Sequence, residues 1–179
     1  MQKLAAFLKR FHSGPAADAY EYLGCHTHED GEGYVFRVWA PHAQSVCVVG
    51  DFNFWNTEDL PMRKLDGGVW EAVSAYAKEG QAYKYCVQGR SGRTVYKTDP
   101  YGNRCCALPE TSSIIDPPDG FCWHDSAYRA RMAKQSAIRR PVNIYEVHAG
   151  SWKRHDDGSY LNYEELATEL VPYVKDMGY

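Results

Sequence analysis

Several features that define whole classes of protein are missing from this 179-residue sequence. None of its apolar runs approaches the ~18 residues of a membrane-spanning helix, and neither sign of charge dominates, because 20 basic residues stand against 23 acidic ones. There is no basic block for nucleic acid or anionic lipid, no internal repeat and no low-complexity tract. These absences exclude a disordered or collagen-like chain. We also expect no nucleic acid and no membrane among the partners.

The six cysteines do not follow the pattern of a secreted, disulfide-stabilised domain. Residues 1–14 contain no apolar stretch long enough for a signal peptide, and their apolar side chains follow helical spacing instead. Cys47 and Cys86 lie in apolar, strand-like runs, and the adjacent Cys105 and Cys106 are poor partners for each other. We therefore expect free thiols in a reducing compartment, which makes the protein cytoplasmic.

A metal site has little support in the sequence. Cys25, His26 and His28 are close together, but their spacing matches no standard zinc signature, and no second pair of ligands follows them. We expect a polar, solvated loop here, and neither a metal nor any other cofactor.

Short strands dominate the first two thirds of the chain. Six segments rich in aromatic and β-branched residues are separated by turn signals every ~8–12 residues, which is typical of an all-β sandwich. The predicted fold is therefore mainly β, an immunoglobulin-like β-sandwich. The segments are residues 34–41, 45–52, 67–73, 82–88, 93–100 and 111–115.

The last third has a different character. Residues 126–140 are basic and strongly helix-forming, residues 142–152 read as a strand that runs into a glycine-containing loop, and an amphipathic helix begins near Asn162. Gly178 stands where a helix would end. A strand, a loop and a helix make one unit of a βα array, and a parallel strand needs neighbours for its backbone groups. We expect the opening of a larger α/β domain here; the alternative is a small helical appendage on the sandwich.

Seven motifs follow one another along the chain in a specific order. They are AYEYLGCH at 19–26, FRVWAPHAQSVCVVGDFNFWN at 36–56, PMRKLDGGVWE at 61–71, YKY at 83–85, KTDPYGN at 97–103, PETSSII at 109–115 and IYEVHAGSW at 144–152. The ordered set resembles the N-terminal part of the bacterial 1,4-α-glucan (glycogen) branching enzymes.

This resemblance implies a division of the chain. Residues 1–19 would be an N-terminal helix, residues 20–118 a β-sandwich carbohydrate-binding module of family 48, and residues 119–141 a linker with a helix. Residues 142–179 would be the first strand and helix of a truncated catalytic (β/α)₈ barrel of glycoside hydrolase family 13. The partners implied are α-glucans such as glycogen and amylose, and the missing catalytic barrel of the same polypeptide.

No catalytic residue is assigned in this chain. Retaining glycoside chemistry needs a carboxylate nucleophile and a carboxylic acid about 5 Å apart, and the resemblance places them on later barrel strands. Glu146 and His148 on the expected first strand invite a catalytic role, but hydrogen bonding and packing in the barrel core explain them better. We therefore expect the chain to be inactive alone.

Glucan binding is the function that the chain itself could perform. Aromatic residues make up 14% of the sequence, and the apolar faces of sugars stack on such rings. By resemblance, Trp55 and Lys84 line the glucan site, and Tyr96 could supply a second stacking surface. The alternatives are a packing role for Trp55 and an ordinary solvated lysine at position 84. Trp39 and Trp70 alternate with polar residues in strands, and we expect both in the core.

Other functions stay open at the level of sequence. One alternative is a stand-alone glucan-binding module, like the glycogen-binding domains of kinase regulatory subunits, although it would have no use for residues 142–179. Another is the N-terminal part of a debranching enzyme or a maltooligosyl-trehalose trehalohydrolase. An immunoglobulin-like protein-interaction domain would leave the aromatic loop around Trp55 unexplained.

Overall fold

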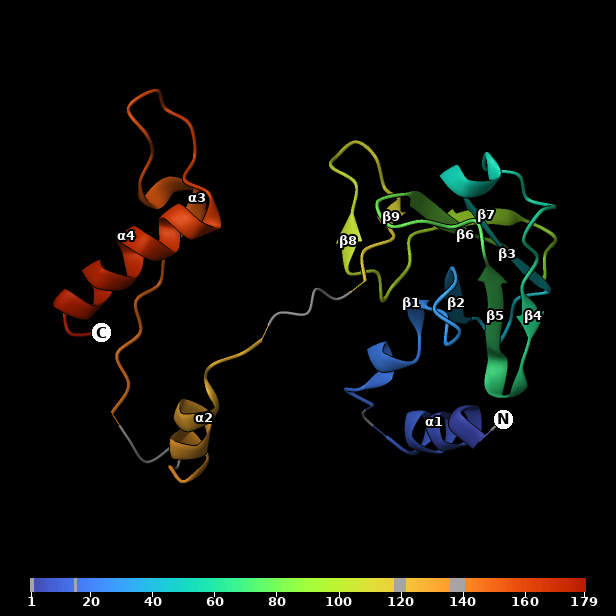
Figure 1. Cartoon of the computed structure of the whole chain (residues 1–179), viewed down its shortest axis with the longest axis horizontal. Coiled ribbons are helices and arrows are strands. Elements are labelled where there is room, and N and C mark those ends of the chain that lie inside the picture. The colour runs from blue at the N-terminus through green and yellow to red at the C-terminus, as the bar shows by residue number, and fades with distance from the viewer. Residues whose placement is uncertain (1, 15, 118–121, 136–140) are drawn as a thin grey trace. The chain divides into compact units, whose positions relative to one another are not determined.

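The computed structural model describes residues 2–14, 16–117, 122–135 and 141–179. The chain divides into two compact units, Met1–Phe121 and Cys122–Tyr179, which we call the first and the second unit (Figure 1). The first unit contains the paired strands of the described chain, and the second contains helices. None of the described helices is both long enough and apolar enough to cross a bilayer.

The first sheet is four-stranded and antiparallel, in the order β1-β2-β5-β4. Its two central strands, β2 and β5, pair over six positions, from Tyr34 opposite Ser74 to Trp39 opposite Val69. The strands are β1 (Gly24–Thr27), β2 (Tyr34–Trp39), β5 (Val69–Ser74) and β4 (Arg63–Lys64).

The second sheet is built around β6, which pairs with three neighbours, all antiparallel. The order is β3-β6-β9-β8, and β7 also pairs with β6. The strands are β3 (Ser45–Gly50), β6 (Ala82–Gln88), β7 (Thr94–Lys97), β8 (Arg104–Cys105) and β9 (Ser113–Ile114).

The main core lies between the two sheets. Alternate residues of each strand point inward, so Phe36 and Trp70 of the first sheet meet Tyr83 and Tyr85 of the second in one buried cluster. Ile115, just after β9, completes it. The predicted mainly β sandwich is confirmed.

A smaller core joins helix α1 (Gln2–Ser13) to the sandwich. The helical spacing expected for this segment is confirmed, because Phe7 is buried between the rings of Phe11 and Tyr22, at centroid distances of 5.0 and 4.5 Å. Leu23 and Val69 are completely buried in the same cluster.

The predicted core position of Trp39 is wrong, whereas that of Trp70 is confirmed. Trp70 is 5% exposed, but Trp39 is 44% exposed. Because Phe36 and Val38 point into the core, the alternation of β2 sends Trp39 to the outer face. There its ring meets the edge of Phe11 of α1, and its Nε1 donates to the carbonyl of Gly67.

Three short strands were not expected from the sequence. β4 and β8 are two residues long and show no alternation, so only the pairing with neighbouring strands defines them. The third, β1, corrects the expected solvated loop at Cys25–His28: Gly24–Thr27 pairs with β2 along its whole length. The ring Nε2 of His26 lies 2.9 Å from the carbonyl oxygen of Leu23.

The second unit contains helices α2 (Ser126–Ala133), α3 (Ala149–Trp152) and α4 (Tyr163–Asp176). The helix expected over residues 126–140 is present as far as Ala133, and residues 136–140 lie outside the described part. The strand expected at the start of residues 142–152 is absent, since the described residues 141–148 have no regular structure. A strand is defined by its ladder of hydrogen bonds, and the described residues offer this segment no neighbouring strand.

Helix α4 confirms both of its predicted ends. The Asn162 side chain accepts hydrogen bonds from the backbone N–H groups of Glu164 and Glu165, and Glu165 accepts one in return from the Asn162 N–H. This is a reciprocal capping box. At the other end, Gly178 takes the left-handed conformation, with φ of 83°. Leu166 is buried.

Candidate binding site

The loop after β3 holds two aromatic residues in an unusual backbone conformation. Phe54 and Trp55 have φ angles of 51° and 61°, in the left-handed region that residues with a side chain seldom occupy. The preceding Asn53 is buried and fixes this shape. Its Oδ1 accepts from the N–H of Gly50 (2.9 Å), and its Nδ2 donates to the carbonyl of Val48 (3.0 Å).

Trp55 is tied to the second sheet through one carboxylate. Its indole Nε1 donates to Oδ1 of Asp51 (3.1 Å), while Oδ2 of Asp51 accepts from the N–H of Ala82 (2.8 Å). The ring is thereby held beside Ala82, the first residue of β6, which lies two residues before Lys84. Trp55 remains 38% exposed, so the residue is partly accessible to a ligand.

Lys84 and Tyr96 share the outer face of the second sheet. Tyr83 and Tyr85 point into the core, so the intervening Lys84 points outward, together with Cys86. Tyr96 stands opposite Cys86 in the β6–β7 register, which makes it a diagonal neighbour of Lys84, roughly 7–8 Å away. Tyr96 is 55% exposed. Two of the three residues predicted from the sequence are thus neighbours, and Trp55 stands at the end of the same strand.

Lys84 has a specific partner that the sequence did not reveal. Its Nζ donates to Oγ1 of Thr111 (2.8 Å), and Oγ1 of Thr98 donates to the Thr111 carbonyl (2.6 Å). Lys84 is therefore not a freely solvated lysine. Only the pairing of β9 with β6 brings Thr111 beside Lys84, since the two are far apart in sequence, and no local pattern signals the contact. Its role in binding, like that of Trp55 and Tyr96, stays a prediction.

A buried carboxylate supports this strand from its inner side. Oδ2 of Asp99 accepts from the hydroxyls of Tyr83 (2.6 Å) and Tyr85 (3.0 Å), and Oδ1 accepts from the N–H of Tyr101 (2.8 Å). Burial raises the pKa of Asp99, although these hydrogen bonds act in the opposite direction. Burial also raises the pKa values of both tyrosines. With only 4% of its surface exposed, Asp99 is enclosed in the core and positions β6; sequence analysis missed it.

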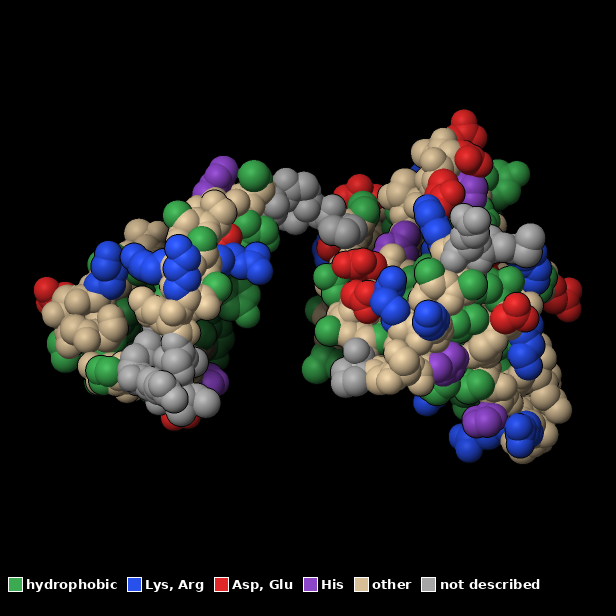
Figure 2. Space-filling view, turned by 90° about the horizontal axis from the view of Figure 1, so that it is seen from below, with side chains coloured by type: hydrophobic (Ala, Val, Ile, Leu, Met, Phe, Trp, Pro, Cys, Tyr) green, Lys and Arg blue, Asp and Glu red, His purple; other side chains and the backbone are tan. Residues whose placement is uncertain are grey.

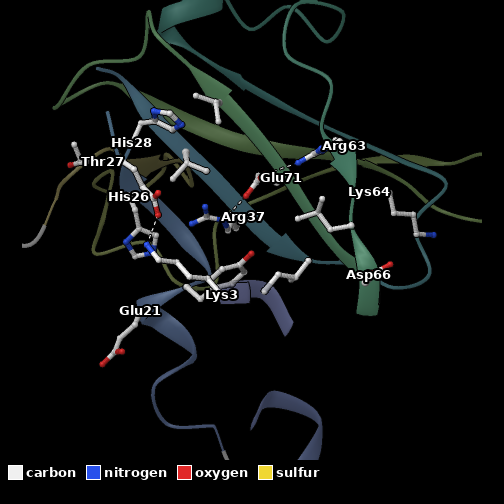
Figure 3. Close-up of a pocket in the computed structure, with 16 residues that line it drawn as sticks. Lys3, Glu21, His26, Thr27, His28, Arg37, Arg63, Lys64, Asp66 and Glu71 are labelled. Atoms are coloured by element: carbon white, nitrogen blue, oxygen red, sulfur yellow. Dashed lines mark hydrogen bonds and ion pairs between the residues drawn. The ribbon is translucent and has the colours of Figure 1, made fainter. Parts of the chain in front are cut away.

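A cavity of about 970 Å³ lies on the other sheet, away from the three predicted residues (Figure 3). At its base, Nε of Arg37 donates to Oε2 of Glu71 (2.7 Å), and Arg63 donates to Oε1 of the same carboxylate (3.2 Å). The Arg37 guanidinium also lies 4.5 Å from the ring centre of Tyr22, whose pKa is raised by burial despite the opposing effect of Arg37.

This cavity fits a glucan less well than the Trp55 surface does. Its lining contains four basic and four acidic residues, and Figure 2 shows the two signs interspersed on the surface of the first unit. Its only tyrosine, Tyr22, already packs against the ring of Phe7 and the guanidinium of Arg37. The other rings in the lining are the imidazoles of His26 and His28. The cavity therefore offers no tryptophan ring for stacking, and its tyrosine ring already has two partners.

The described residues of the second unit show no assembled catalytic group. Nδ1 of His148 lies 2.9 Å from Oγ of Ser151, but the contact is local to one helical turn, and both residues are exposed. Glu146 is exposed as well, so the expected packing of Glu146 and His148 in a barrel core stays a prediction. Within the described parts of the chain, no three His, Cys, Asp or Glu side chains gather as metal ligands would.

Known proteins resemble both the whole chain and its sandwich. Residues 22–102 match carbohydrate-binding module 48 (isoamylase N-terminal domain). The 1,4-alpha-glucan branching enzyme GlgB of Lactiplantibacillus plantarum is 46% identical over 171 residues, which cover 94% of this chain and 26% of that protein. GlgB of Deinococcus radiodurans is 49% identical over 160 residues, covering 88% of this chain and 23% of that protein.

Among solved structures, the maltotriose complex of PulA from Klebsiella pneumoniae covers 59% of this chain and 13% of its own, with 27% identity and a TM-score of 0.45. The strand order described above, rather than this partial superposition, defines the fold. The chain spans about a quarter of the length of the curated relatives it matches. It is therefore similar in sequence to the N-terminal part of the 1,4-alpha-glucan branching enzymes, and its residues 22–102 match the model of carbohydrate-binding module 48.

Proposed function

We propose that this chain is the glucan-binding N-terminal part of a 1,4-α-glucan branching enzyme. Such an enzyme cuts an α-1,4-glucan chain and transfers it to a 6-hydroxyl group, which creates an α-1,6 branch. The observation that carries the proposal is the surface formed by Trp55, Lys84 and Tyr96 within the region that matches a carbohydrate-binding module. The relatives named as branching enzymes, similar over nearly the whole chain, support the assignment.

The proposed site recognises an α-glucan in two ways. The C–H faces of two or more glucose units stack on the exposed rings of Trp55 and Tyr96, and Lys84 donates hydrogen bonds to hydroxyl groups. The contact between Lys84 and Thr111 holds the ammonium group in place, so less side-chain entropy is lost when the sugar binds. The Asp51 carboxylate does the same for the Trp55 ring.

Catalysis belongs to the part of the relatives that this chain does not span. Residues 142–179 are proposed to form the beginning of that catalytic domain, a (β/α)₈ barrel, in which strand neighbours would supply the hydrogen-bond ladder that residues 142–148 lack here. A cytoplasmic location is part of the proposal, supported by the free state of all six cysteines. We expect no branching activity from the chain by itself.

Affinity electrophoresis in gels with and without glycogen tests the binding site. Trp55→Ala should weaken glycogen retention of the chain at least about tenfold, the change that corresponds to 1.4 kcal/mol. Trp39→Ala is the matched control, because Trp39 is also a half-exposed tryptophan whose Nε1 is hydrogen-bonded, but on the other sheet. The control should retain wild-type binding.

Two results would contradict the proposal. Equal retention of the wild-type chain in both gels would leave a sandwich that only orients the catalytic domain. Branching activity of the chain alone, measured by iodine staining, would contradict the expected absence of catalytic carboxylates. Circular dichroism of both tryptophan variants excludes loss of binding through unfolding.

A further inference from the structure

Phe54 combines an exposed side chain with a strained backbone. Its side chain is 92% exposed, so it gains almost nothing from the burial that normally stabilises a phenylalanine. Its backbone is left-handed, with φ of 51° and ψ of 32°, a conformation that places Cβ too close to the carbonyl oxygen in residues other than glycine. A single exposed apolar residue needs no explanation, but an exposed one in a strained conformation does.

The surrounding loop fixes this conformation, whatever residue occupies position 54. The buried Asn53 side chain bonds both ends of the turn, donating to the carbonyls of Val48 and Asn56. The N–H of Trp55 donates to the carbonyl of Gly50 (2.9 Å). Asparagine or glycine would fit the left-handed position with less strain, so phenylalanine is not the residue that stability alone favours here.

The neighbours of Phe54 indicate the kind of ligand. Phe54 directly precedes Trp55 in the sequence, and the four residues after Trp55, Asn56 to Asp59, are all polar and exposed. Centres of protein–protein interfaces are depleted in charged residues. Sugar sites instead combine exposed rings with amide, hydroxyl and carboxylate groups, which satisfy the hydroxyls around the stacked apolar face.

We propose that Phe54 is a further stacking residue of the Trp55 site, which the loop holds in solvent for contact with an α-glucan at a cost in stability. The inference rests on the proposed glucan-binding function. It adds a binding residue outside the set of Trp55, Lys84 and Tyr96. Removing Phe54 should therefore have opposite effects on stability and on binding, a combination that a purely structural residue cannot give.

The test measures thermal unfolding and glycogen retention of the 179-residue chain carrying Phe54→Asn. The melting temperature should rise by about 4 °C, because the strain is relieved and no buried surface is lost. Glycogen retention should fall severalfold, to a level between those of the wild type and Trp55→Ala. Phe54→Gly should weaken binding equally, with a smaller gain in melting temperature, since glycine adds entropy to the unfolded chain.

Tyr20→Asn is the control for the loss of an exposed ring. Tyr20 is 59% exposed. Its segment, Ala19–Glu21, lies near α1, at the end of the first unit away from the loop after β3 (Figure 1). Its replacement should leave retention unchanged.

Two outcomes overturn the inference without touching the proposed function. If Phe54→Asn retains glycogen as well as the wild type while Trp55→Ala does not, Phe54 lies outside the site and serves another contact, such as one with a protein surface. If the melting temperature falls, the position is not strained in the way described. If retention is unchanged in Phe54→Asn and Trp55→Ala alike, the proposed function itself fails.

Discussion

The two units of this chain differ in how completely they bury their apolar side chains. In the first unit, two antiparallel sheets and α1 enclose two clusters, with Phe36, Tyr83 and Tyr85 almost completely hidden from solvent. Among the described residues of the second unit, Leu166 is the only buried apolar side chain. Ile144 and Tyr163 are more than three quarters exposed.

The difference follows from the kind of hydrogen bonding in each unit. Sheet pairing joins residues that are distant in sequence, so each strand of the sandwich brings its apolar face against another layer. The helices of the second unit satisfy their backbones locally, and the Tyr173 ring meets Tyr145 (6.1 Å) and Trp152 (5.7 Å) edge to face. Local structure alone does not create a core, and helices of this length depend on packing for their stability.

The largest expected effect comes from separating the two units. Residues 1–121, expressed alone, should unfold cooperatively, with a melting temperature close to that of the whole chain. Residues 122–179 alone should show partial helix and no cooperative transition, because the one buried apolar side chain among their described residues cannot offset the conformational entropy of ordering the segment. Circular dichroism during heating distinguishes the cases. A sharp transition in the second fragment would remove the contrast between the units.

The next effect compares one aromatic ring of each unit. Phe36→Ala removes a fully buried ring that contacts Tyr83 (5.1 Å) and Phe52 (5.7 Å), and should lower the free energy of unfolding by roughly 3–5 kcal/mol. Tyr173→Ala in the second unit, where the ring is 44% exposed, should cost less than about 1 kcal/mol. Urea denaturation followed by fluorescence measures both. Equal costs would mean that the second unit has a core of its own.

The smallest effect concerns pH. Burial raises the pKa of Asp99 above its unfolded value of 3.8, so the folded protein binds this proton more tightly than the unfolded chain does. The stabilisation is complete below the unfolded pKa and is lost as the pH rises through the folded pKa. The free energy of unfolding of the wild type, relative to Asp99→Asn, should therefore increase as the pH falls from 7 towards 4.

For an exposed carboxylate of the second unit, the pKa shifts in the opposite direction. Hydrogen bonds from Ser159 lower the pKa of Asp157. Carboxyl NMR titration should accordingly place the midpoint of Asp99 above, and that of Asp157 below, the values of the unfolded chain. An Asp99 midpoint below its unfolded value would contradict the enclosure of this carboxylate in the core.

Local sequence patterns predicted much of the sandwich. Strand β6 occupies Ala82–Gln88 as expected, and β2 begins at the expected Tyr34 and ends two residues before Pro41. The short strands β4 and β8 could not be predicted, because two residues carry no periodicity. Each residue of the candidate site was predicted individually. Their arrangement was not, because no local sequence pattern indicates that Lys84 and Tyr96 become diagonal neighbours across β6 and β7.

The sequence by itself determined those features that depend on neighbours along the chain: the alternation of the long strands, the turns between them and the capped ends of α4. The tertiary structure alone decided the outward position of Trp39, the burial of Asp99 beneath two tyrosines and the contact of Lys84 with Thr111. Each of these depends on which strands pair and which face is covered, and those are properties of contacts between residues far apart in the sequence.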